Sequence, residues 1–275
     1  DPVMLRIEED CYWFSLADSD ILFWAQGLNV NLKYDVEITE PDVSPIQIQG
    51  PKSKDIMVKI FGNKILELKY YWFKKFKLGN INLLISRTGW SSEFGYEMFL
   101  LKTSDGDELY ETLMQEGKDL GLHPGHTSTI RRIEGGMLSY HSDMDINSNP
   151  FELGLDKFID LDKSFDFVGK NALIKIKELG IQRKQVGLII KCEKLKGPNT
   201  KKWDIFKNQQ YIGQVTSAVY SPRLEQNIAL AIVDIKFSDI NTSLKIKIDD
   251  KLVDAKITVK PFFDPNKLIA KKRSI

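Results

Sequence analysis

Short stretches in which apolar and polar side chains alternate dominate the first half of the chain, and such alternation predicts β-strands. Residues 2–7 and 11–16 alternate on either side of an acidic turn at 8–10, which predicts a hairpin. Further strands are predicted at residues 36–38, 46–49, 70–76, 82–86 and 96–100. Because neighbouring strands in the sequence pair readily as hairpins, the pattern favours an antiparallel sheet.

Three amphipathic stretches between these strands predict helices. Ser19-Asp20 form a predicted N-cap for a helix that begins at residue 21. A second helix is predicted over 52–60, with Pro51 at the first helical position that proline favours. A third is predicted over 107–120, closed by Gly121. Helices interspersed with hairpins predict an α+β fold with an antiparallel sheet.

After residue 180 the chain consists of short β segments separated by turns. They are predicted at 186–191, 203–207, 211–218, 228–233, 244–248 and 252–259. Such a series predicts a small antiparallel barrel or sandwich, and we expect the barrel. The predicted domains are therefore 1–166 and 167–275, with the boundary running through a helix at 170–179.

Composition and charge exclude several classes of function. The 275 residues carry 39 basic and 38 acidic side chains, so no long-range field favours nucleic acid or an anionic membrane. Cys11 and Cys192 lie far apart without metal-ligand spacing, and we expect free thiols in a reducing cytoplasm. His123, His126 and His141 share no ligand spacing, so no metal site is predicted. No apolar run approaches the ~20 residues that span a bilayer.

The most specific segment is Ser86-Arg87-Thr88-Gly89-Trp90-Ser91-Ser92-Glu93-Phe94-Gly95-Tyr96-Glu97, in which a strand enters a glycine-bounded turn and a second strand follows. It resembles the Arg-Thr-Gly-Tyr-Thr-Gly-Glu-Asp-Gly-Phe-Glu run of the folate-dependent aminomethyltransferase family, typified by the glycine-cleavage T-protein. Four further segments resemble family blocks in the same order, at 47–53, 143–155, 167–173 and 213–231. On these segments the chain is identified as a member of that family.

The resemblance implies a fold, a cofactor and a group of partners. The implied fold is a folate-binding antiparallel domain followed by a C-terminal antiparallel barrel, and the implied cofactor is tetrahydrofolate. Family members carry a further stretch ahead of the position of Asp1, so we expect this chain to be a fragment that lacks part of the pocket. The expected partner is a small-molecule one-carbon donor, with neither nucleic acid nor membrane involved, and a homodimer is left open.

Glu97 is the first candidate for cofactor binding. A reduced pterin presents a ring N–H beside a 2-amino group, and one carboxylate can accept from both donors. The resemblance implies that the pterin-binding glutamate of the family falls on Glu97. The alternative is a solvent-facing glutamate on an alternating strand.

Aromatic side chains are the next candidates. The resemblance places two pocket tyrosines of the family at Tyr71 and Trp90, where we expect contact with folate. An aromatic face can also hold a sulfonium or quaternary cation, for about 0.5–2 kcal/mol. Trp90 and Tyr96 are therefore candidates for donor binding, and ordinary core packing is the alternative for the aromatic cluster.

Two further residues match family positions. Asp1 aligns with the aspartate that is held to act at folate N5 and the transferred carbon, so it is the catalytic candidate; Asp20 is the rival carboxylate, with a helix cap as its expected role. Arg132 matches a family arginine and is a candidate for cofactor binding. An ion pair of Arg132 with Glu134 or Asp143 is the alternative.

The departures from the family pattern indicate the donor. Ser91-Ser92-Glu93-Phe94 replaces a Thr-Gly-Glu-Asp loop, and Ser128 stands where the T-protein has an arginine. These changes resemble the dimethylsulfoniopropionate demethylase branch, which implies methyl transfer from a small onium donor to tetrahydrofolate. The alternatives are an aminomethyltransferase of the glycine-cleavage type, a sarcosine or dimethylglycine demethylase, and a non-enzymatic folate-binding assembly module.

Overall fold

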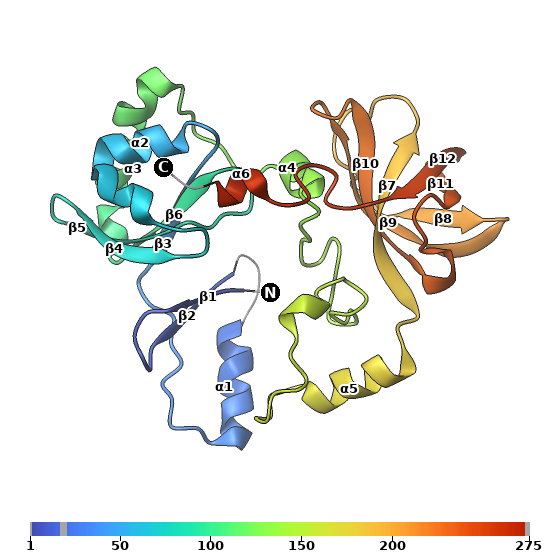
Figure 1. Cartoon of the computed structure of the whole chain (residues 1–275), viewed down its shortest axis with the longest axis horizontal. Helices are drawn as coiled ribbons and strands as arrows, with labels where there is room; N and C mark the ends of the chain where they lie inside the picture. Colours follow the sequence, from blue (N-terminus) through green and yellow to red (C-terminus); the bar gives the residue numbers. More distant parts are fainter. Residues whose placement is uncertain (1, 17–20, 273–275) are drawn as a thin grey trace. The chain divides into compact units, whose positions relative to one another are not determined.

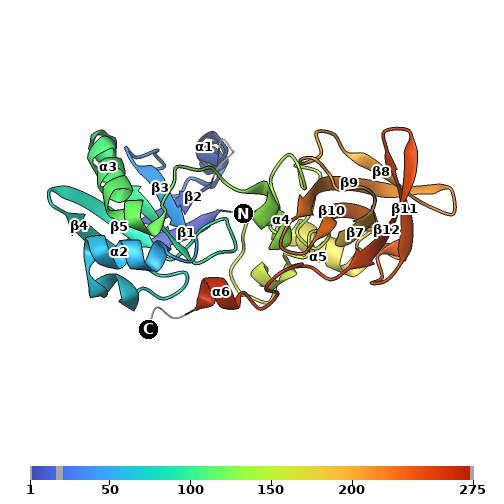
Figure 2. The same cartoon turned by 90° about the horizontal axis from the view of Figure 1, so that it is seen from above.

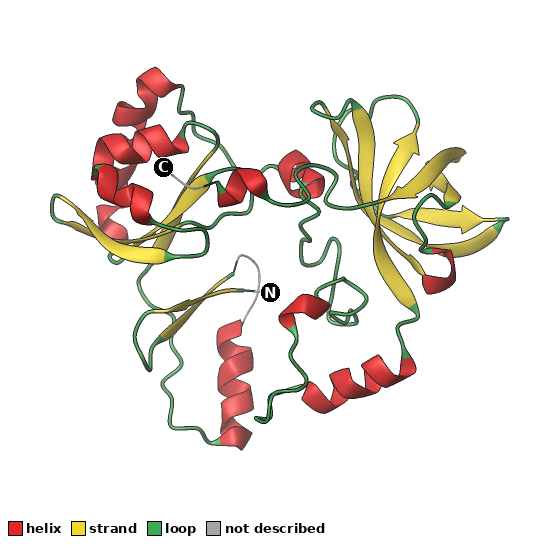
Figure 3. Cartoon of the chain, in the orientation of Figure 1, coloured by secondary structure: helices red, strands yellow, loops and turns green. Residues whose placement is uncertain are grey.

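A computed structural model describes residues 2–16 and 21–272, and it divides the chain into two compact units (Figure 1). The first unit contains residues up to 89, 93–125 and those from 269 onward. The second unit contains 90–92 and 126–268. Seen from above, each unit has its own sheet system (Figure 2), and the first unit contains both helices and strands (Figure 3). The predicted α+β class is confirmed.

The strands of the first unit form a two-stranded hairpin and a four-stranded antiparallel sheet in the order β3-β6-β5-β4. The hairpin joins β1 (Val3–Arg6) to β2 (Tyr12–Ser15), as predicted. The sheet strands are β3 (Ser44–Gln49), β4 (Phe73–Leu78), β5 (Ile81–Ser86) and β6 (Gly95–Leu100). The strand predicted at 36–38 is wrong, because these residues lie in irregular chain that pairs with no neighbouring strand.

The helices of the first unit confirm two predictions and correct one. They are α1 (Ile21–Leu32), α2 (Ser53–Phe61) and α3 (Gly106–Gly117). The expected N-cap of α1 at Ser19-Asp20 lies outside the described residues. Pro51 is not the first residue of α2 but lies in the turn before it, and Lys52 occupies the N-cap. After α3 a 3-10 turn runs to Leu120. This helical segment ends at Gly121, whose φ of 78° suits glycine.

Two apolar clusters bury the two faces of the four-stranded sheet. Helices α2 and α3 cover one face, where the buried side chains are Ile48, Ile56, Met57, Ile65, Leu68, Ile81, Leu83, Ile85, Phe94, Tyr96, Met98, Leu100, Leu109 and Leu113. On the other face, Leu84 of β5 and Phe99 of β6 pack with Leu5 of the β1–β2 hairpin. Strand β6 is therefore apolar on both sides along part of its length.

The second unit is built around a closed barrel in the order β10-β7-β12-β11-β8-β9. Its strands are β7 (Arg183–Lys191), β8 (Trp203–Lys207), β9 (Gln210–Ser221), β10 (Gln226–Asp234), β11 (Ser243–Ile248) and β12 (Lys251–Thr258). All six predicted segments are confirmed, and closure gives every barrel strand two neighbours. A Cβ at Gly213 would lie 2.1 Å from the Ile232 carbonyl oxygen, so glycine permits this close approach of β9 to β10.

Three helices complete the described chain: α4 (Thr129–Glu134), α5 (Lys170–Leu179) and α6 (Leu268–Lys271). Short 3-10 turns occur at Asn63–Glu67, Thr103–Asp105, Lys118–Leu120, Asp156–Phe158 and Ile235–Phe237. Ile133 of α4 packs on the outside of the barrel with Val219, Ile228 and Leu230, which groups the residues from 126 onward with the barrel. The predicted domains, 1–166 and 167–275, were divided by sequence pattern rather than by contacts between residues. That division stays a prediction. No described helix is long and apolar enough to cross a bilayer.

Candidate functional site

A row of polar residues crosses the four-stranded sheet of the first unit. Gln47 of β3 and Ser86 of β5 are the direct partners of Glu97 on β6, so the three side chains share one face. Tyr96 and Met98 point to the opposite face, which α2 and α3 cover. Glu97 therefore lies on the face that the hairpin only partly covers.

A hydroxyl chain orients the carboxylate of Glu97. Thr88 Oγ1 donates a short hydrogen bond to Glu97 Oε2, and Ser86 Oγ lies 2.5 Å from Thr88 Oγ1. A threonine hydroxyl has a single proton, so Ser86 donates to Thr88 while Thr88 donates to Glu97. Burial raises the pKa of the Glu97 carboxyl above its ordinary value, and the bond from Thr88 acts in the opposite direction. Among the described residues, Glu97 Oε1 has no hydrogen-bond partner, so it remains able to accept.

Glycines at both ends of the 89–95 turn make room for one side chain. A Cβ at Gly89 or at Gly95 would lie 2.3 Å from the amide group of Gln49. Gln49 Nε2 donates to the Thr88 carbonyl oxygen at 3.2 Å. Two segments that resemble separate family blocks thus meet at Gln49, and this contact fixes the backbone that carries Thr88.

Tyr71 lies at the surface of the first unit, on the connection that leads into β4. Its side chain is 61% exposed and its backbone φ is 63°. Its ring packs edge-on to Tyr70 at 4.7 Å, and its backbone N–H donates to the Arg87 carbonyl oxygen at 3.1 Å. Burial raises the pKa of the Tyr70 phenol to about 12, which keeps that hydroxyl neutral. Tyr71 is thus an exposed aromatic face that is tied to the 86–97 segment.

The structure does not support the expected donor contact of Tyr96. Its side chain is fully buried among the apolar residues beneath α2 and α3, and its ring packs edge-on to Phe94 at 5.6 Å. The alternative of ordinary core packing describes this residue.

The sequence analysis assigned no role to Arg87, whose side chain is 2% exposed. Its guanidinium donates to the Gly95 carbonyl oxygen at 3.2 Å and to the Ala270 carbonyl oxygen at 2.8 Å. It also lies 3.6 Å from the ring centroid of Phe94. Burial lowers the pKa of this guanidinium, yet arginine stays charged at any physiological pH. Arg87 therefore stabilises the turn between β5 and β6 from its buried side.

Trp90 and Arg132 belong to the second unit, where the structure brings them together. The guanidinium carbon of Arg132 lies 5.7 Å from the ring centroid of Trp90, within the range of a cation–π contact. Trp90 is partly buried, so part of its ring surface is covered and part is accessible. The predicted cation contact of Trp90 is thus already made by a protein side chain.

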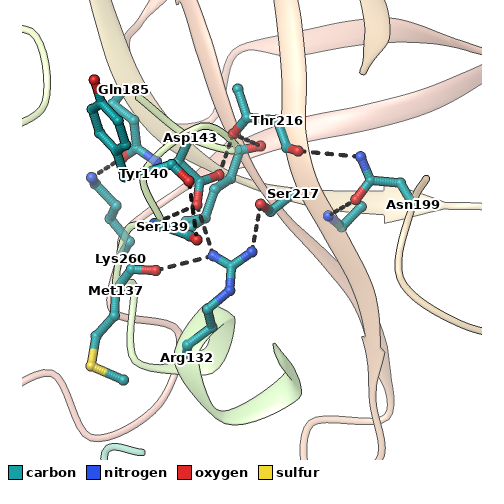
Figure 4. Close-up of polar contacts among 12 residues, drawn as sticks. Arg132, Met137, Ser139, Tyr140, Asp143, Gln185, Asn199, Thr216, Ser217 and Lys260 are labelled. Carbon is teal, nitrogen blue, oxygen red and sulfur yellow. Dashed lines mark hydrogen bonds and ion pairs between the residues drawn. The ribbon is translucent and has the colours of Figure 1, made fainter. Parts of the chain in front are cut away.

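Arg132 forms a buried ion pair, in agreement with one of the two predicted alternatives. Its Nη1 donates to Asp143 Oδ2 at 2.7 Å and to the Met137 carbonyl oxygen at 3.3 Å, and its Nη2 donates to Ser217 Oγ at 2.8 Å (Figure 4). The predicted pair with Glu134 is wrong, because residues two apart on a helix do not face each other. Nothing in this arrangement supports the predicted contact of Arg132 with folate.

Glu134 pairs instead with Arg131, three residues earlier, at 2.9 Å. It also accepts a hydrogen bond from Ser221 Oγ at 2.6 Å, so it joins α4 to the end of β9. Ser128 occupies the N-cap of α4, where its hydroxyl accepts from the Arg131 backbone N–H at 3.4 Å. The serine found at the position of a family arginine therefore has a structural role. The catalytic candidate Asp1 lies outside the described residues.

The fold and this site define a class of protein: an antiparallel α+β unit with a half-buried glutamate on its sheet, joined to a closed six-stranded antiparallel barrel. The profile of the GCVT N-terminal domain matches residues 1–163, and the profile of the glycine cleavage T-protein C-terminal barrel domain matches residues 183–264. The chain belongs to the glycine-cleavage T-protein family. This is a family of enzymes that use tetrahydrofolate as the one-carbon acceptor or carrier.

Relatives within the family differ in activity. The chain is 34% identical over 250 residues to the dimethylsulfoniopropionate demethylase DmdA of Ruegeria pomeroyi, which covers 91% of this chain and 68% of that protein. It is 32% identical over 273 residues to an aminomethyltransferase of Alkaliphilus metalliredigens, covering 97% of this chain and 73% of that protein. This chain thus spans about two thirds to three quarters of the length of these two relatives.

A solved structure shows the same fold. The glycine cleavage system aminomethyltransferase T from Bartonella henselae superposes with a TM-score of 0.71 at 20% identity, covering 88% of this chain and 66% of that chain. The expected antiparallel domain followed by a C-terminal barrel is confirmed.

Proposed function

We propose that the protein transfers a methyl group from a small onium donor, of which dimethylsulfoniopropionate is the type, to tetrahydrofolate. Support comes from the similarity to DmdA over nine tenths of the chain. Further support comes from Ser128, which stands at the position of a T-protein arginine and caps a helix.

The Glu97 arrangement is the observation that carries the proposal. Its carboxylate lies half-buried on a sheet face, is oriented by Thr88, and keeps one oxygen without a partner among the described residues. A pterin edge with two adjacent N–H donors fits such an acceptor, since hydrogen bonds to an ionised group are strong where water is excluded. The residues present therefore fit the reduced pterin of tetrahydrofolate.

The remaining steps ask little acid–base chemistry of the protein. Tetrahydrofolate supplies, when bound, the N5 nucleophile that receives the methyl group. Loss of a methyl group converts a sulfonium donor into a neutral thioether, so no residue has to protonate the leaving group. The chain then has to orient the reactants and exclude water. We assign the orientation of the pterin to Glu97 and Tyr71, the shaping of the donor side to Trp90, and the proton at N5 to Asp1.

An aminomethyltransferase is the second candidate, favoured by the Alkaliphilus relative, whose similarity extends over 97% of this chain. Release of an amine or thiol from an aminomethyl donor requires a general acid. Among the described site residues, Glu97 is a carboxyl whose pKa is raised by burial. In an aminomethyltransferase it would have to bind the pterin and also act as the general acid.

The test is a donor panel with the purified full-length protein and tetrahydrofolate. The donors are dimethylsulfoniopropionate, glycine betaine, sarcosine, dimethylglycine and an aminomethylated lipoyl protein. Formation of 5-methyltetrahydrofolate from dimethylsulfoniopropionate supports the proposal. Turnover of the lipoyl substrate alone supports the second candidate. Folate binding without turnover of any donor supports the assembly module.

A further inference from the structure

Lys260 lies in the second unit, on the segment that follows β12. The backbone N–H groups of Phe262 and Phe263 both donate to the Glu134 carbonyl oxygen, at 2.9 and 3.0 Å. Behind this segment, a Cβ at Gly136 would lie 3.4 Å from Pro261 Cα, so the end of α4 packs directly against it. Lys260 is thus held in a fixed place beside the barrel.

The donors around Lys260 outnumber the acceptors. Its ammonium donates one short hydrogen bond, to Gln185 Oε1 (Figure 4), and it forms no ion pair among the described residues. Gln185 is 2% exposed, and its Nε2 group has no acceptor within the described part of the chain. Two N–H bonds of the ammonium and two of the amide therefore have no acceptor among the described residues. The Gln185 amide is buried, and buried donors are normally satisfied.

The surrounding charges are predominantly positive. Lys157 and Lys184 lie close enough to oppose the charge on Lys260, and Asp143 is the carboxylate that favours it. Both oxygens of Asp143 are already engaged, by Arg132 at 2.7 Å and by Thr216 Oγ1 at 2.6 Å. Burial, as the largest cause, lowers the pKa of the Lys260 ammonium to about 8. An additional negative charge would relieve this imbalance.

We propose that Lys260 and Gln185 form a binding site for a small oxyanion, a carboxylate or a phosphate group, on the second unit. The anion supplies acceptors to both donor groups and a negative charge to the three lysines. Because the Lys260 side chain is partly exposed, an anion can reach it from solvent. No step of the proposed methyl transfer passes through this site, so the two proposals stand or fall separately.

Competitive labelling of lysines with trace acetic anhydride tests the site in the whole protein. The reaction is run in one buffer at pH 7 with added acetate, phosphate or chloride at equal ionic strength. A bound oxyanion raises the pKa of the neighbouring amine by about one unit and so lowers the labelling of Lys260 about tenfold. We expect this loss in acetate or phosphate but not in chloride. The anion that protects at the lower concentration identifies the class of ligand. Lys236, an exposed lysine on the same unit, serves as reference and should label equally with all three added anions.

Two variants at one position provide the matched control. Gln185→Leu removes the amide, and the protection by oxyanions should be lost. Gln185→Glu places a carboxylate beside Lys260, which should then label slowly with all three added anions without further protection. Equal labelling of Lys260 in the wild-type protein in acetate, phosphate and chloride would overturn the proposal, and so would undiminished protection in both variants.

Discussion

Glu97 of the first unit and Asp143 of the second are both carboxylates withdrawn from solvent, but their surroundings differ. Asp143 is 3% exposed and accepts from Arg132, Thr216 and the backbone N–H of Ser139. Glu97 accepts from Thr88 alone among the described residues, and no described cation pairs with it. A carboxylate with both oxygens engaged and a cation beside it holds a fold together, whereas one that is buried and has an oxygen without a partner is suited to a ligand.

The largest expected effect concerns Asp143. Replacement by alanine leaves the buried Arg132 without its counter-ion, and loss of one partner of such a pair costs about 3–5 kcal/mol. We expect the free energy of unfolding, measured by urea denaturation, to fall by that amount. Asp254→Ala, which removes an exposed carboxylate paired with Lys245, is the control and should change little. Equal stability of the two variants would show that Asp143 is not structural.

Glu97→Gln should weaken ligand binding and leave the stability of the fold almost unchanged. Tetrahydrofolate binding should weaken by about 1.5–3 kcal/mol, the range for a hydrogen bond to a charged group, which is roughly a ten- to hundredfold rise in Kd. The melting temperature should barely move, because ionised Glu97 gains little from its surroundings. Calorimetric titration measures the affinity, with Glu108→Gln on the exposed side of α3 as control. An unchanged Kd would remove Glu97 from the site.

Trp90→Leu is expected to act on the donor. If Trp90 holds a cation, the donor KM should rise roughly two- to thirtyfold, from a cation–π energy of about 0.5–2 kcal/mol. Folate affinity should change less, and a neutral isostere of the donor should show no penalty. Equal losses for the onium and neutral ligands would mean that Trp90 stacks on the pterin, and would favour the aminomethyltransferase.

The smallest effect is a shift in pH dependence. Thr88 stabilises the ionised form of Glu97, so Thr88→Val should raise the pKa of this carboxyl further. Folate binding to the carboxylate is lost as pH falls through this pKa, and the midpoint of that loss should therefore move to higher pH. For folding the sign is reversed, because a carboxyl whose pKa is raised in the folded state destabilises that state as pH rises through the pKa. Affinity measured against pH gives the midpoint, and Thr112→Val on α3 should leave it unchanged.

The barrel could be predicted from the sequence because a series of short β segments separated by turns is typical of a small antiparallel barrel. The sheet of the first unit was harder, because β6 is apolar on both faces. A two-residue period then does not show that Tyr96 faces the helices while Phe99 faces the hairpin. The segment at 36–38 alternates for too few residues to specify a partner strand.

The site was predictable only where residues lie within one motif. Glu97 was found from its place in the 86–97 segment, and the cross-strand position of Ser86 was open to detection from the same alternation. The pairs Arg132–Ser217 and Lys260–Gln185 join residues 85 and 75 positions apart. The first forms where α4 packs against β9, and the second where the segment after β12 lies near β7. No local pattern encodes such contacts. Arg87 looked like an ordinary motif arginine because its acceptor, Ala270, lies 183 positions further along.

The long sequence separation between Arg87 and Ala270 has a consequence during protein synthesis. The turn between β5 and β6 is made early, but one of the two carbonyl groups that receive the Arg87 guanidinium belongs to α6, which is translated long afterwards. Until Ala270 has left the ribosome, the nascent first unit holds a cation that lacks one of its acceptors. The Arg87 side chain therefore gains its full set of protein acceptors only after all six strands of the barrel have been translated.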